Sequence, residues 1–141
     1  MREIKFRAWN KDWKMMVLPE DLQAIWFDGV TACAADVEFN ITTADGQRHK
    51  NLWEDCEKDE VMLMQYTGLK DKNGVEIYEG DIVSYTVVKK AHFPKDKYTT
   101  NKVGVVSISP RGGTRIAGNA FSRHGKIEVI GNLHQNPELL K

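Results

Sequence analysis

The chain has 141 residues, 41% of them hydrophobic and 28% charged, with a formal net charge of zero. This length and composition predict a soluble globular protein of one domain or two small lobes, with a core large enough to fold without disulfide bridges. No apolar run approaches the roughly 20 residues that span a bilayer, and the alternating residues 1–6 lack the apolar region of a signal peptide. We therefore expect a cytoplasmic protein with no membrane partner. Cys33 and Cys56 are then reduced thiols, although a disulfide between them stays open.

The predicted elements of the first half are short strands. Ile4, Phe6 and Ala8 alternate with polar or bulky neighbours, and residues 13–18 form a return strand, so we expect an N-terminal β-hairpin. Residues 24–27 and 37–41 are further short strands, and Asp45-Gly46 is a turn signal. The polar residues 47–60 predict a connector or a short exposed helix.

The second half has a sharper pattern of strands and turns. We expect strands at residues 61–66, 75–78, 82–88, 103–108, 114–117 and 126–130. Gly68 ends the first of them, and turns follow at Gly74 and Gly80, because glycine accepts a positive φ. Residues 89–101 read as a basic loop and residues 118–125 as a second loop. Asn136 followed by proline starts a short helix, whose two leucines close one end of a small barrel or sandwich.

Charge is unevenly distributed along this pattern. Residues 1–83 hold 10 Lys or Arg and 17 Asp or Glu, a net charge of −7. Residues 84–126 hold nine Lys or Arg and one Asp, a net charge of +8. The remaining stretch has a net of −1. Such asymmetry predicts an anion-binding face, halves that attract each other, or copies that pack head to tail.

Three stretches of the chain resemble a known family. Residues 1–9 read MREIKFRAW, residues 63–83 read LMQYTGLKDKNGVEIYEGDIV, and residues 130–140 read IGNLHQNPELL. These stretches are similar to the opening, the central signature and the closing segment of the YopX family of phage and prophage proteins. Residues 19–60 and 89–125 carry no usable resemblance.

The resemblance implies a mainly β fold with one or two short helices. An SH3-like small barrel in the C-terminal half, residues 61–141, would follow an N-terminal β-hairpin and connector region, residues 1–60. The resemblance also implies self-association in a bacterial host cell. It brings no set of functional residues to transfer to this chain.

Catalytic and metal-binding patterns are weak. Zinc needs about four ligands in close Cys and His pairs, and the two cysteines are 23 positions apart with no histidine nearby. Glu76, Glu79 and Asp81 can be drawn as an acid–base pair, but a carboxylate that accepts backbone N–H groups in a bend explains Asp81 more simply. The Arg111-Gly112-Gly113 run lacks the rest of a phosphate loop. We therefore predict no enzyme activity, cofactor, metal or small-molecule substrate.

The basic segment 84–126 is the feature with functional content. Cations attract a phosphate backbone, and exposed aromatic rings stack on unpaired bases. The candidate anion or nucleic-acid contacts are Lys89, Lys90, Lys95, Lys97, Lys102, Arg111, Arg115, Arg123 and Lys126, with Phe93 and Tyr98 as candidate stacking residues. A solvated basic face, or a complement to the acidic half, is the competing interpretation. Our first hypothesis is thus a non-enzymatic accessory protein that forms a homo-oligomer, and the second is a nucleic-acid-binding module.

Overall fold

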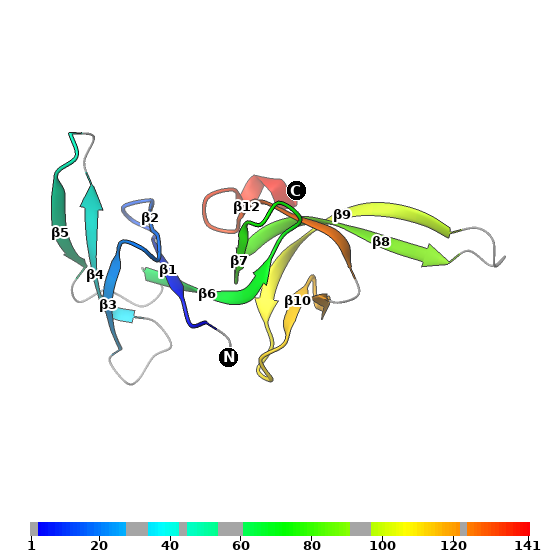
Figure 1. Ribbon diagram of the computed structural model, residues 1–141, viewed down its shortest axis with the longest axis horizontal. Helices are drawn as coiled ribbons and strands as arrows, with labels where there is room; N and C mark the ends of the chain where they lie inside the picture. The colour runs from blue at the N-terminus through cyan, green and yellow to red at the C-terminus, as the bar shows by residue number, and fades with distance from the viewer. Residues whose placement is uncertain (1–2, 28–33, 43–44, 54–60, 91–96, 122–123) are drawn as a thin grey trace. The chain divides into compact units, whose positions relative to one another are not determined.

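Figure 1 shows the computed structural model, which describes residues 3–27, 34–42, 45–53, 61–90, 97–121 and 124–141. The protein is mainly β with almost no helix, which confirms the predicted class. The chain divides into two compact units. The N-terminal unit is Ile4–Gln65, and the C-terminal unit is Tyr66–Lys141 with Met1–Glu3.

The N-terminal unit begins with the predicted hairpin. Strand β1 (Phe6–Asn10) pairs antiparallel with β2 (Met15–Val17) and, on its other side, with the first half of β6 (Val61–Lys70). Trp13 was expected in the return strand but lies in the turn, where its backbone N–H donates to the Asn10 side-chain oxygen over 2.7 Å. Because an Asn side chain that accepts from the backbone stabilises a turn, the return strand starts later than predicted.

A second sheet of the N-terminal unit has the strand order β3-β4-β5. Its strands are β3 (Leu22–Phe27), β4 (Ala34–Thr42) and β5 (Arg48–Trp53). The connector or helix predicted for residues 47–60 is wrong where the structure describes it, because residues 48–53 form β5. Register with β4 explains the difference: Lys50 Nζ lies 2.7 Å from Glu38 Oε1 on one face, while Trp53 is buried on the other.

The N-terminal unit has its own hydrophobic core. Its buried members are Ala8, Val17, Val37, Phe39, Trp53 and Val61. The rings of Phe39 and Trp53 lie 4.5 Å apart between centroids, and the ring of Trp13 meets Trp53 edge-on at 5.8 Å. Trp9 is also buried, whereas Trp13 is 58% exposed.

Five strands of the C-terminal unit form a curled half-barrel sheet of order β11-β10-β9-β8-β12. These strands are β8 (Asp81–Lys90), β9 (Lys97–Ile108), β10 (Thr114–Ile116), β11 (Asn119–Ala120) and β12 (Gly125–Asn132). A further strand, β7 (Glu76–Tyr78), pairs with the second half of β6. Neighbouring strands run antiparallel throughout.

Strand β6 runs through Gly68, where the sequence predicts its end. Gly68 has a φ of 80°, and the register between β6 and β7 shifts between Tyr66 and Lys70. Glycine with a positive φ beside a register shift is typical of a β-bulge, so Gly68 bends the strand without ending it. Gly74 and Gly80 do take the predicted turns, with φ values of 84° and 81°.

The largest difference from the sequence prediction concerns residues 89–101. We expected a basic loop, but β8 continues to Lys90 and β9 begins at Lys97, with an unbroken register between the two strands. Tyr98 and the two threonines after it are good strand formers, a signal that the surrounding lysines obscured. Residues 91–96, which include Lys95 and Phe93, lie outside the described residues.

The C-terminal unit has a second core. Its buried members are Ile77, Val83, Tyr85, Val106, Ile116 and Ile127. The predicted terminal helix is a short 3-10 helix, η2 (Pro137–Leu140), and the Asn136 side chain does not cap it. Leu139 packs against Gly131: a Cβ added to Gly131 would lie 2.8 Å from the Cδ1 atom of Leu139. Leu139 and Leu140 stay 37% and 42% exposed, so they cover the surface of the unit more than they fill its core.

Candidate functional site

Strands β8 and β9 extend beyond the rest of their sheet as a two-stranded ribbon (Figure 1). Strand β12 pairs with β8 no further out than Thr86, and β10 pairs with β9 no further out than Val106. We call residues 87–90 and 97–104 the ribbon. In the part of the chain that the structure describes, no third strand pairs with the ribbon residues of β9 on the side away from β8.

Backbone groups alternate along this free edge of β9. The Ala117 N–H donates to the Val105 carbonyl over 3.1 Å, so Val105 directs its backbone groups away from β8. In an antiparallel strand this direction alternates from residue to residue. Thr99, Asn101 and Val103 therefore direct their N–H and C=O groups toward the free edge, and all three residues are exposed.

The ribbon also exposes bulky side chains. Val88, Tyr98 and Val103 are 60%, 53% and 45% exposed. Alternation along β9 places Tyr98, Thr100 and Lys102 on one face of the ribbon. Thr100 is half-buried, and Lys102 is exposed. The ribbon thus offers an unpaired backbone edge beside an exposed ring and an exposed cation.

The nine predicted basic contacts do not form one cluster in the described structure. Lys102, Arg111, Arg115 and Lys126 are all exposed but lie on different elements. Lys102 is on the ribbon, whereas Arg111 is in the β9–β10 turn, on the order of 20 Å or more along the strand at about 3.3 Å per residue. The Arg115 guanidinium donates to the Gly118 carbonyl over 2.9 Å.

Of the other five predicted contacts, three have a described backbone position and two lie outside the described residues. The backbone register sets Lys89 opposite Tyr98 and Lys90 opposite Lys97 at the end of the ribbon. Lys95 and Arg123 lie outside the described residues. The register therefore brings three of the predicted lysines and Tyr98 into two adjacent cross-strand pairs.

The base of the ribbon is tightly packed. The Tyr85 ring lies 4.5 Å from the His124 ring between centroids. A Cβ added to Gly104 would lie 3.1 Å from the side chains of Ala117 and Ile116 and 3.2 Å from the Tyr85 ring. The side chains at the base of the ribbon thus pack so closely on Gly104 that a Cβ there would require its neighbours to shift.

The acidic residues at and near the β7–β8 bend accept hydrogen bonds from groups close by. The buried Asp81 carboxylate accepts the Tyr78 N–H over 2.8 Å, which confirms the structural interpretation of this residue. The Glu76 carboxylate accepts the Tyr78 hydroxyl over 2.8 Å, and Glu79 accepts the Ile108 N–H over 3.4 Å. Each of the three carboxylates thus has a hydrogen-bond donor within its own unit.

Asp71 connects its own turn to β12, a role that the sequence did not predict. Its carboxylate accepts the N–H groups of Asn73, Val75 and Val129 over 2.7, 3.0 and 3.0 Å. Burial raises the pKa of this carboxyl, but the three backbone donors and the nearby Lys72 outweigh burial and leave the pKa below its ordinary value. The Asp-Lys-Asn-Gly run signalled the local turn, but nothing local signalled Val129.

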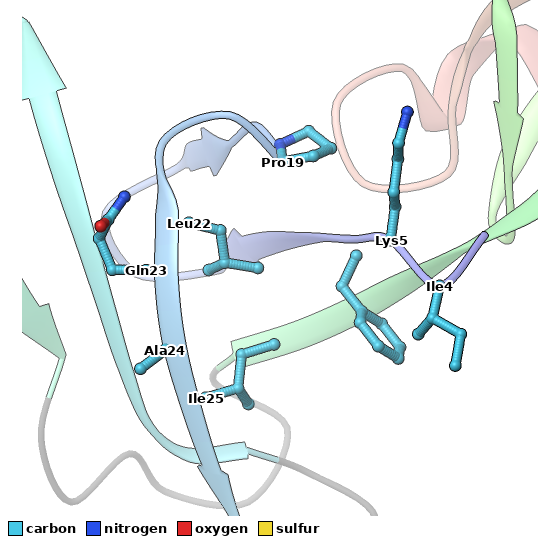
Figure 2. Close-up of a pocket in the computed structure, with 8 residues that line it drawn as sticks. Ile4, Lys5, Pro19, Leu22, Gln23, Ala24 and Ile25 are labelled. Atoms are coloured by element: carbon cyan, nitrogen blue, oxygen red, sulfur yellow. The ribbon is translucent and has the colours of Figure 1, made fainter.

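A hollow of about 430 Å³ lies within the N-terminal unit (Figure 2). Its lining is mostly apolar and consists of Ile4, Lys5, Phe6, Pro19, Leu22, Gln23, Ala24 and Ile25. Leu22 and Ile25 point into it, whereas Lys5 extends away from it. Among the described residues that line the hollow there is none of the predicted contact residues and no carboxylate, thiol or imidazole.

The described part of the chain was also searched for groups of metal ligands and for membrane-spanning helices. No group of three or more His, Cys, Asp or Glu side chains among the described residues is arranged to hold a metal ion. Cys33 and Cys56 fall outside the described residues, so their state stays a prediction. No helix within the described ranges is long and apolar enough to cross a bilayer.

Comparisons with known proteins agree with the fold. The family model described as YopX protein matches residues 5–141. Among solved structures, the crystal structure of protein EF1440 from Enterococcus faecalis is similar, with a TM-score of 0.68 and 26% identity. The match covers 100% of both chains. A comparison with curated proteins found no match.

Proposed function

The chain belongs to the YopX family, and from this premise we propose that it is a non-enzymatic phage or prophage accessory protein that acts by self-association. It works in the cytoplasm of the bacterial host. In this proposal the curled sheet of the C-terminal unit is an SH3-like barrel, and the ribbon is the element through which copies meet.

The observation that carries the proposal is the unpaired edge of β9. An exposed strand edge is a template for pairing with another chain. Proteins that stay monomeric usually shorten or cover such edges, whereas this edge runs along β9 with no strand over it among the described residues. The exposed Val88, Tyr98 and Val103 add apolar surface beside the edge.

The charge distribution also supports association between copies. Residues 1–83 carry a net of −7 and residues 84–126 a net of +8. Opposite charges on different copies attract at long range and speed encounter. Surface attraction of this kind weakens as salt screens it, so association has a salt-dependent and a salt-independent part.

Sedimentation equilibrium of the full chain tests the proposal. We expect a dimer or larger oligomer at tens of micromolar, because an interface of modest size gives dissociation constants around the micromolar range. Raising the salt from about 50 mM to about 500 mM should weaken the association without abolishing it. A monomer at every concentration and salt would overturn the proposal.

Nucleic-acid binding is the second candidate, favoured by the register at the end of the ribbon. Lys89, Lys90 and Lys97 occupy adjacent cross-strand positions with Tyr98 among them. A two-stranded β-ribbon fits the major groove of DNA, and lysines contact phosphates without reading sequence. Fluorescence anisotropy with single- and double-stranded oligonucleotides should then show binding that weakens steeply with salt. Absence of binding at about 50 mM salt would remove this candidate.

A further inference from the structure

The free edge of β9 can pair with the same edge of a second copy of the chain. We propose that two copies of the chain pair their β9 edges antiparallel about a two-fold axis centred on Thr100. The inference rests on the proposed self-association and adds where the copies meet and in which register.

The alternation of backbone groups restricts which registers are possible. Thr99, Asn101 and Val103 direct their N–H and C=O groups outward, as the bond from Ala117 to Val105 establishes. Two copies can therefore pair only where outward-directed residues of one face outward-directed residues of the other. Strand β9 has no register shift against β8 over this stretch, so no bulge interrupts the alternation of backbone groups along its edge.

The turn after β10 sets the limit of the pairing. The Val105 carbonyl already accepts the Ala117 N–H over 3.1 Å, so a partner strand has to stop before Val105. A two-fold centred on Thr100 places Lys97 of one copy opposite Val103 of the other and uses the free edge fully. A centre at Asn101 would place Lys97 of one copy opposite Val105, where the edge is already occupied.

Side chains agree with the register centred on Thr100. It pairs Thr99 with Asn101 of the second copy on one face, and Tyr98 with Lys102 of the second copy on the other. Tyr98 is 53% exposed and Lys102 is exposed, so both are available for a cation–π contact across the pair. No lysine of the described β9 residues faces a lysine of the other copy, which removes the like-charge repulsion that destabilises cross-strand pairs.

Disulfide trapping tests the register directly. In a non-hydrogen-bonded antiparallel pair the two Cα atoms lie about 4.5 Å apart, within the range that a disulfide spans. In a chain with Cys33→Ser and Cys56→Ser, we expect Thr100→Cys to form a cross-linked dimer on mild oxidation. The matched control is Val88→Cys, which is exposed on β8 of the same ribbon and has no partner in this register. We expect at least about tenfold less cross-linking of this control.

Two further variants separate the register from nonspecific contact. A mixture of Thr99→Cys and Asn101→Cys chains should form a mixed dimer, whereas Asn101→Cys alone should cross-link poorly. Equal cross-linking of Thr100→Cys and Val88→Cys, or stronger cross-linking of Asn101→Cys with itself, would overturn the inference. If the unmodified chain sediments as an oligomer while Thr100→Cys fails to cross-link, the inference fails and the proposed self-association stands.

A backbone variant tests the pairing without cysteine. Asn101→Pro removes an N–H that points to the free edge and not to β8, so the ribbon should keep its ladder. Asn101→Thr keeps this N–H and is the matched control. Loss of two intermolecular hydrogen bonds per dimer should raise the dissociation constant at least about tenfold in Asn101→Pro alone. Circular dichroism checks the fold, and a folded Asn101→Pro that associates like the unmodified chain would contradict the proposal.

Discussion

Asp71 and Asp81 show how single carboxylates stabilise the C-terminal unit. Asp81 accepts the Tyr78 N–H at the bend before β8. Asp71 accepts two N–H groups of its own turn and a third from Val129 on β12. A charged acceptor with several donors is among the stronger hydrogen-bonding arrangements in proteins. These two residues therefore connect turns to the sheet.

The lowered pKa of Asp71 predicts a pH-dependent stability. A carboxyl whose pKa is lower in the folded than in the unfolded state stabilises the fold above the unfolded pKa, and this contribution is lost as pH falls through the folded pKa. We expect Asp71→Asn to lower the free energy of unfolding by about 1–3 kcal/mol at neutral pH. The difference from the unmodified protein should shrink below about pH 4.

Urea denaturation at a series of pH values measures this difference. The control is Asp12→Asn, which removes an exposed carboxylate and should change stability little at any pH. A difference for Asp71→Asn that stays constant down to about pH 2 would contradict the proposed linkage.

At the scale of elements, the ribbon depends on the packing at its base. Gly104 lies where β9 passes the turn after β10, and a Cβ at this position would lie closer to its neighbours than an ordinary van der Waals contact. In the outer part of the ribbon, β8 and β9 pair only with each other among the described residues. Isolated two-stranded hairpins are only marginally stable in water. The base must therefore hold the ribbon in place.

We predict that Gly104→Ala destabilises the C-terminal unit. The added methyl group would lie 3.1 Å from Ala117 Cβ and Ile116 Cγ2, and overpacking of this kind costs about 1–3 kcal/mol. The matched control is Gly113→Ala, whose added methyl would lie 3.4 Å from Ser109 Oγ, an ordinary contact. Thermal unfolding should show a lower midpoint for Gly104→Ala, and equal midpoints for the two variants would count against this packing argument.

At the scale of the whole molecule, the chain has two separate cores. Phe39 and Trp53 belong to the core of the N-terminal unit, while Ile77 and Ile116 belong to that of the C-terminal unit. Strand β6 contributes residues to both units, because its first half pairs with β1 and its second half with β7. Each unit therefore has its own source of hydrophobic stabilisation.

Because each unit has its own core, we predict that a destabilising substitution in one core lowers the hydrogen-exchange protection of that unit alone. Phe39→Ala removes a fully buried ring and should cost about 3–5 kcal/mol. We expect hydrogen exchange to show faster exchange in β3, β4 and β5, with β8 and the inner half of β9 little changed. Ile116→Ala should give the reverse pattern. A uniform loss of protection over both units in either variant would show that they unfold as one.

Features that depend on neighbouring residues could be predicted from the amino-acid sequence. Alternation of apolar and polar residues predicted the mainly β class and the N-terminal hairpin, and Gly74, Gly80 and the role of Asp81 followed from turn chemistry. The central signature indicated the family. All of these features depend on a few adjacent residues, so the chain shows them without its fold.

Features that depend on partners far apart in the sequence could not be predicted in this way. Strand β5 forms because the polar residues 48–51 and the two apolar residues after them find a register with β4. Gly68 bends a strand because β7 pairs on both sides of it. The third bond of Asp71 comes from a residue 58 positions away. The free edge of β9 exists because β10 turns away at Ala117. Pairing across the chain satisfies backbone groups whose partners local propensity does not specify, so the candidate interaction edge became visible only in the folded protein.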